Sequence, residues 1–179
     1  MEIRLRRYYG DNHVTKSRME VVMEGETAPR LVCEAREPRF KEYTEVFEGA
    51  AKYCLPVGKW QLRVGGSPYS PMGLRVAKCP GHRQVYIGHN WMRQWEVGRV
   101  LIGYPTETEL PDEVEIENGE ECCRELEKLV YEAFGNGEEM WLEIRNEGVE
   151  DPLCPDGHLP RNGETMRGVG EELETNYEL

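Results

Sequence analysis

Short runs of alternating apolar and polar residues, separated by turn residues, recur along the first 103 residues of this chain. Alternation with a period of two is typical of strands that have one buried face. The runs are Met1 to Tyr9, Arg18 to Met23, Leu31 to Ala35, Lys59 to Val64, Leu74 to Lys78, Val85 to Ile87 and Val100 to Ile102. The first three, divided by the turn sequences GDNH and EGET, predict an antiparallel opening meander. Short strands with turns between them favour a small β-rich domain.

One helix is predicted, in the acidic second part of the chain. Its apolar residues recur at helical spacing, and Gly135-Asn136-Gly137 marks its end. Asn118 is expected to be the N-cap, with Glu121 as the reciprocal partner of a capping box. The expected apolar stripe consists of Cys122, Leu126, Leu129, Val130, Ala133 and Phe134. A last strand should run from Met140 to Ile144.

Two segments are harder to assign. Residues 36–54 have apolar residues at roughly helical spacing, which is compatible with a short helix or an irregular cover over a sheet edge. Residues 113–117 are compatible with one more strand. The sequence thus predicts a mostly β (α+β) domain over residues 1–145 with one clear helix, and an acidic tail containing glycine and proline over residues 146–179.

Charge divides unevenly along the chain. Residues 1–103 hold 17 Lys/Arg and 11 Asp/Glu, a net charge of +6, whereas residues 104–179 hold 5 and 23, a net charge of −18. We therefore expect the acidic tail to bind the basic part of its own chain or a partner. Nucleic acid is not an expected partner, because the whole chain carries −12 and shows no nucleic-acid-binding signature.

The sequence contains no targeting segment of a recognisable kind. No apolar run is long enough for a membrane-spanning helix, so no membrane association is expected. The start, MEIRLRRYYGDNH, alternates charged and apolar residues, whereas a secretory signal needs a continuous apolar segment. We expect a soluble protein that is cytoplasmic as made, either free or as part of a virion or injection assembly.

The stretch from Val85 to Gly103 is the best candidate for a binding site. Between two strand-like runs it concentrates polar and aromatic residues, and loops between strands often carry function. The two tryptophans could stack on a sugar ring or an exposed base, although packing as local core is the commoner role of such residues. The candidate binding residues are His89, Asn90, Trp91, Trp95 and Arg99.

Several short motifs, taken in order, resemble an uncharacterised domain family of bacteria and their phages. They are MEIRLRR at the start, LPVGKW at residues 55–60, SPY at residues 67–69 and the stretch at residues 85–103. The resemblance spans roughly residues 1–145. Members of that family typically show an isoleucine-histidine-x-glycine-asparagine motif followed by glycine-cysteine-isoleucine-leucine-x-glycine. This pairing is similar to that of the L,D-transpeptidases, cysteine enzymes that cut and rejoin peptidoglycan stem peptides, and it implies a related β-rich scaffold.

The chain departs from both motifs at the catalytic positions. In the second motif Arg99 stands where the nucleophilic cysteine is expected, and arginine cannot attack a carbonyl. In the first motif Ile87 or Gly88 occupies the histidine position, so that His89 is out of register in either alignment. The resemblance therefore implies a non-catalytic binding or structural protein on a degenerate scaffold, in a bacterial, phage or phage-derived system.

The guanidinium of Arg99 suggests what such a protein would bind. Its fork of donors matches the two oxygens of a carboxylate, so a peptide or protein surface is the expected partner, with a peptidoglycan stem peptide as one example. The alternative is that Arg99 pairs with an acidic residue of its own chain, which is the commoner arrangement because an unpaired charge in a pocket is costly.

A second interpretation is that the protein is an active enzyme. In it the chain is a cell-wall peptide-processing cysteine enzyme whose nucleophile has moved to Cys79, with His89 as its base. Without a secretory signal the six cysteines are expected to be reduced, and burial is the usual state of a free cysteine. A catalytic thiol would have to be an exception to that rule.

No cofactor is expected, and zinc is the weaker alternative. The pairs Cys79/His82 and Cys154/His158 could together supply four tetrahedral ligands. They lie more than seventy residues apart and lack the Cys-x2-Cys spacing of structural zinc sites. Ordinary proline and glycine turns explain both sequences, CPGH and CPDGH.

Overall fold

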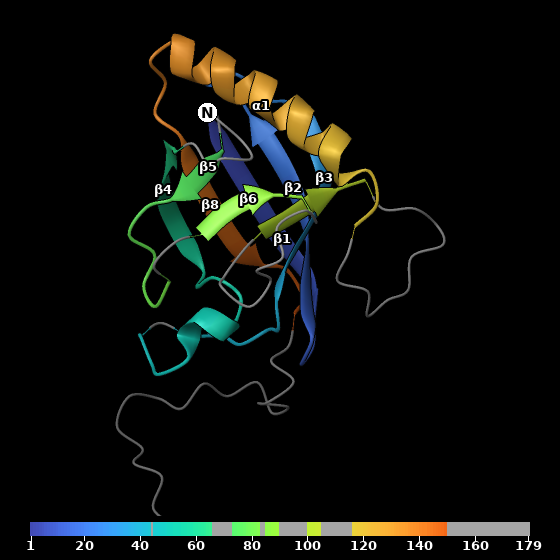
Figure 1. Cartoon of the computed structure of the whole chain (residues 1–179), viewed down its shortest axis with the longest axis vertical. Coiled ribbons are helices and arrows are strands. Elements are labelled where there is room, and N and C mark those ends of the chain that lie inside the picture. Colours follow the sequence, from blue (N-terminus) through green and yellow to red (C-terminus); the bar gives the residue numbers. More distant parts are fainter. Residues whose placement is uncertain (44, 66–72, 83–84, 90–99, 105–115, 150–179) are drawn as a thin grey trace, which may run out of the picture.

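The structure, a computed structural model, describes residues 1–43, 45–65, 73–82, 85–89, 100–104 and 116–149. Within these residues eight strands form a closed barrel, and one α-helix lies across one end of it (Figure 1). The mostly β, α+β fold predicted from the sequence is therefore confirmed. The elements are β1 (Glu2–Gly10), β2 (Val14–Val22), β3 (Leu31–Pro38), the 3-10 turn η1 (Ala50–Lys52), β4 (Gly58–Val64), β5 (Leu74–Val76), β6 (Val85–Gly88), β7 (Val100–Gly103), α1 (Gly119–Gly135) and β8 (Trp141–Asn146).

The strand order around the barrel is β1-β2-β3-β7-β6-β5-β4-β8, and β8 closes the ring against β1. The predicted antiparallel meander of β1, β2 and β3 is confirmed. Two neighbouring pairs are parallel: β8 beside β1, and β6 beside β7. Because β1 and β8 pair to close the barrel, Ile3, near the start of the described chain, lies opposite Leu142, near its end.

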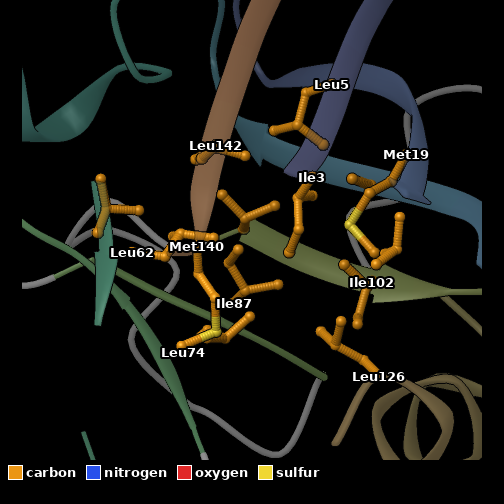
Figure 2. Packing of buried hydrophobic residues seen from close by; sticks show 14 of the residues in the cluster. Ile3, Leu5, Met19, Leu62, Leu74, Ile87, Ile102, Leu126, Met140 and Leu142 are labelled. Atoms are coloured by element: carbon orange, nitrogen blue, oxygen red, sulfur yellow. The ribbon is translucent and has the colours of Figure 1, made fainter. Parts of the chain in front are cut away.

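Alternation along the strands fills the barrel with apolar side chains. Ile3 and Leu5 of β1 point inward with Met19 of β2, and all three are fully buried. Figure 2 shows these side chains in one cluster with Leu62 of β4, Leu74 of β5 and Leu142 of β8. The interior is therefore a packed core, which sets the positions of the loops at its two ends.

Helix α1 closes one end of the barrel with four side chains at helical spacing. Leu126 lies beside Ile102 of β7 in the core (Figure 2). Phe134, expected in the apolar stripe, is 62% exposed, so that part of the prediction is wrong. It comes one residue after the last core-facing position, and one residue turns the side chain by about 100° around the helix. The core-facing helix residues are Cys122, Leu126, Val130 and Ala133.

The start of α1 also differs from the prediction. Asn118 occupies the N-cap position, but it adopts the left-handed conformation with φ 52° and makes no side-chain capping bond. Its amide instead donates to the carbonyl of Tyr104 at 3.4 Å. The expected capping box with Glu121 is therefore wrong, because a capping box needs an N-cap residue with extended backbone and Asn118 is left-handed.

The remaining segments can now be assigned. Residues 36–54 continue β3 to Pro38 and contain one short helical turn, η1, so they form mostly irregular cover. Of the suggested strand at 113–117, only Ile116 and Glu117 lie in the described residues, and they are outside any strand. The five described cysteines are free thiols, as expected. In the described part of the chain, no helix combines the length and apolar character needed to span a membrane.

Candidate functional site

The two strands that carry the sequence motifs are neighbours in the barrel. β6 and β7 run parallel, with Ile87 opposite Val100 and Gly88 opposite Leu101. Parallel pairing places the ends of both strands on the same side of the sheet. The residue that follows β6, His89, is thus carried to the end of the barrel where α1 begins.

His89 lies against the first residue of α1. A Cβ atom added at Gly119 would come within 2.8 Å of the His89 Cβ and 3.0 Å of the Ile102 carbonyl oxygen. Any side chain at position 119 would displace one of these groups. The missing side chain of Gly119 therefore leaves room for His89. The half-buried His89 lies between β7 and the N-terminus of α1, which is the positive end of the helix dipole.

A second close approach joins the end of β7 to the residues just before the helix. A Cβ atom at Gly103 would lie 2.6 Å from both the Glu117 carbonyl oxygen and the Ile116 side chain. The Tyr104 amide donates to the same Glu117 carbonyl at 3.2 Å. The Tyr104 hydroxyl donates to Glu125 on α1, and burial together with this carboxylate raises the pKa of Tyr104. The end of β7 is therefore held against the start of α1 by close backbone contacts and two hydrogen bonds.

Most of the predicted site lies outside the described residues. Of the five candidate binding residues, His89 is described, whereas Asn90, Trp91, Trp95 and Arg99 are not. For the suggested zinc site, Cys79 and His82 are described and Cys154 and His158 are not. In the described ranges, no cluster of three or more His, Cys, Asp or Glu side chains is arranged to hold a metal ion.

The barrel also contains a buried ion pair that the sequence analysis missed. The Arg7 guanidinium donates to both carboxylate oxygens of Glu37, at 2.8 and 2.7 Å, and to the Leu55 carbonyl at 2.6 Å. The Leu55 amide donates to Glu37 at 2.9 Å. Both charged side chains are at most 1% exposed. The pair joins β1, β3 and the segment before β4.

A signal for this pair is present in the strand alternation. Ile3 and Leu5 point inward, and the next inward position on β1 is Arg7. On β3, the inward series through Cys33 and Ala35 continues to Glu37. Two opposite charges at inward positions of nearby strands predict a buried ion pair, because neither could be buried alone.

A tyrosine and a histidine extend the buried polar cluster. The Tyr43 hydroxyl lies 2.7 Å from His82 Nε2 and donates to the Cys54 carbonyl at 3.2 Å. His82 Nδ1 is buried without a hydrogen-bond partner in the described structure. Burial lowers the pKa of His82, although Glu37 opposes this effect, so the ring is neutral at pH 7. A neutral imidazole fits a structural contact in this apolar setting.

The cysteines near this cluster are poor nucleophiles. Cys79 is 5% exposed, and burial together with the nearby Glu37 raises its pKa to about 12. Burial also raises the pKa of Cys54. At the helix end, a hydrogen bond with Cys122 and burial raise the pKa of Cys33. These thiols are protonated at neutral pH, whereas nucleophilic attack requires the thiolate.

The arrangement thus contains one candidate binding junction, around His89, and one buried structural cluster, around Arg7 and Glu37. Their residues belong to different strands: His89 follows β6, whereas Arg7 lies on β1 and Glu37 on β3. Comparison of the chain with protein families, with curated proteins and with solved structures finds no match.

Proposed function

We propose that the protein is a non-catalytic binding protein, built on a degenerate L,D-transpeptidase-like scaffold and belonging to a bacterial, phage or phage-derived system. The observation that carries the proposal is the parallel pairing of β6 and β7. In the resemblance, Ile87 or Gly88 holds the histidine position, and Arg99, directly before Val100, holds the cysteine position. The register of the two strands has Ile87 opposite Val100, and such motifs can act together only when they are close. Neighbouring strands support the reading of the two motifs as parts of one site.

The chemistry of the chain favours binding over catalysis at this site. The nucleophile position of the second motif carries Arg99, which cannot form an acyl intermediate. The alternative nucleophile, Cys79, lies in the buried cluster, and its pKa of about 12 leaves a very small thiolate fraction at neutral pH. Burial of Cys79 therefore weighs against a cysteine enzyme with a relocated nucleophile.

The proposed ligand is the carboxylate of a peptide, such as a peptidoglycan stem peptide. Arg99 would supply the bidentate donors, while His89 borders the same motif. A charge-assisted pair of hydrogen bonds contributes about 1.5–3 kcal/mol to binding. Loss of the guanidinium in Arg99→Ala should weaken binding by roughly tenfold to a hundredfold.

Co-sedimentation with purified peptidoglycan sacculi tests this proposal. The natural protein is compared with His89→Ala and Arg99→Ala, and with Arg18→Ala as a control, because Arg18 is an exposed arginine of β2 that pairs with Glu20 and lies outside the two motifs. The supernatant is checked for released or cross-linked peptides. Binding without turnover, reduced by Arg99→Ala and unchanged by Arg18→Ala, is the expected result. Peptide release that depends on Cys79 would establish the enzyme instead, and absence of binding would overturn the choice of ligand.

A further inference from the structure

Two arginines and a tyrosine lie next to one another on the outer face of β4, β5 and β6, and the proposed peptide site does not involve them. Arg63 of β4 lies directly opposite Arg75 of β5, and Arg75 lies directly opposite Tyr86 of β6. The alternate residues Leu62, Leu74 and Val76 are buried in the core, so both arginines belong to the solvent face. We call Arg63, Arg75 and Tyr86 the basic face.

Like charges directly opposite one another on antiparallel strands destabilise a sheet, since their Cβ atoms are only about 4.5–5.5 Å apart. The Arg75 side chain also lies close to the end of β4, because its Nε atom is 3.9 Å from the position that a Gly65 Cβ would occupy. The two positive charges therefore share one small area of surface. An anionic group placed between them would remove the repulsion.

The other arginines on the described strands all have an acidic partner. In the described strands, every arginine except Arg63 and Arg75 forms an ion pair with a carboxylate. The paired ones are Arg4, Arg6, Arg7, Arg18, Arg36 and Arg145. Arg63 and Arg75 have no hydrogen bond or ion pair among the residues that the structure describes. Among the arginines of the described strands, those of the basic face are thus the exception.

We propose that the basic face binds the acidic segment 168–179 of the same chain. This segment contains four glutamates and no lysine or arginine. Three of the glutamates, Glu171, Glu172 and Glu174, lie close together in sequence, so their carboxylates match two adjacent guanidinium groups. Charge complementarity identifies the occupant, and the contact is independent of the proposed peptide site.

The covalent connection favours this occupant over a separate anion. Val149, the last described residue, has its Cγ1 atom 3.0 Å from the position of a Gly10 Cβ at the end of β1. From there to Glu171 the chain has about 20 residues, which span up to about 70 Å when extended. Since β8 is only about 20 Å long, this length reaches every part of the barrel surface. A tethered segment is also present at an effective concentration in the millimolar range.

Zero-length carbodiimide cross-linking of the full chain, followed by peptide mass spectrometry, tests the proposal. The variants Arg63→Lys and Arg75→Lys keep the positive charge and supply an amine that can be joined to a carboxylate. The natural pair of Lys59 and Glu2, whose Nζ and Oε1 atoms are 2.8 Å apart, is an internal positive control. Arg18→Lys is a matched control, because its neighbour is Glu20.

The expected result is a link within one chain between residue 63 or 75 and Glu171, Glu172 or Glu174. Its yield should be comparable to that of the Lys59–Glu2 link, and it should disappear when the three glutamates are changed to glutamine. Arg18→Lys should link to Glu20 and not to the segment. Links to residues 105–115, links between light and isotopically heavy chains, or no link while the Lys59 control succeeds would each overturn the proposal.

Discussion

The Arg7 guanidinium and the Glu37 carboxylate form a bidentate ion pair inside a barrel whose other inward positions are largely apolar. Each partner has a further bond to the backbone of Leu55, so the pair connects two strands to the segment that precedes β4. Burial opposes the charge of Arg7, but the charge and hydrogen bonds of Glu37 hold the pKa of Arg7 above its ordinary value, and the guanidinium stays charged. The cluster therefore keeps its stability only while both charges are present.

Removing one partner of this pair should be strongly destabilising. Glu37→Gln leaves a buried positive charge without its counter-ion, and breaking a buried pair in this way costs about 3–5 kcal/mol. The double variant Arg7→Met/Glu37→Met should cost less than the sum of the two single variants, because no buried charge remains. Urea unfolding measures all three. Arg18→Met, at an exposed pair, should cost under about 1 kcal/mol, and an equal loss in Glu37→Gln would contradict the structural role.

Local patterns in the sequence predicted much of this barrel. Alternation identified the strands and their inward residues, and the same alternation places Arg7 and Glu37 inside. Closure could not be predicted in this way. The parallel pairing of β8 with β1 joins residues about 140 apart in sequence, and no local pattern specifies such a partner.

The candidate site was predicted less completely than the fold. The position of His89 beside Gly119 depends on the approach of β6, β7 and α1, which the sequence does not reveal. Asn118 is the N-cap residue, as expected, but the expected capping box with Glu121 was wrong because the Asn118 side chain bonds to the Tyr104 carbonyl instead. Asn90, Trp91, Trp95 and Arg99 stay predictions, since they lie outside the described residues.

The two ends of α1 should respond in opposite ways to alanine. Gly119→Ala would place a Cβ atom 2.8 Å from that of His89, so it should destabilise the fold by about 1–3 kcal/mol despite the better helix propensity of alanine. Gly135→Ala, at the other end, meets nothing within 4 Å and should be neutral or stabilising by up to about 1 kcal/mol. Thermal unfolding compares them. Equal effects of the two substitutions would show that position 119 is not tightly packed.

Cys79 should react slowly with thiol reagents in the native protein. A rise in its pKa from 9.0 to about 12 lowers the thiolate fraction at pH 7 by roughly a thousandfold, and burial further limits access. Labelling at neutral pH, with the modified residue identified by mass spectrometry, measures the rate. In denaturant all six cysteines should react rapidly. Fast reaction of Cys79 in the folded protein would support the alternative that the nucleophile has moved to this residue.

The neutral, buried state of His82 should make stability depend on pH below about 7. Burial lowers the folded pKa of His82 below the ordinary value of 6.5, so below pH 6.5 the unfolded chain binds a proton that the folded protein does not. Stability should therefore fall as the pH drops, by up to about 1.4 kcal/mol per pH unit, until the folded pKa is passed.

His82→Gln should flatten this dependence, even though loss of the contact with Tyr43 lowers stability at every pH. The informative quantity is the slope of the unfolding free energy against pH, because it counts the protons taken up on unfolding and does not depend on the absolute stability. Urea titrations at several pH values between about 5 and 7 give the slopes. The same slope in His82→Gln and in the natural protein would mean that His82 is protonated alike in the folded and unfolded chains, and that its contact with Tyr43 does not require the neutral ring.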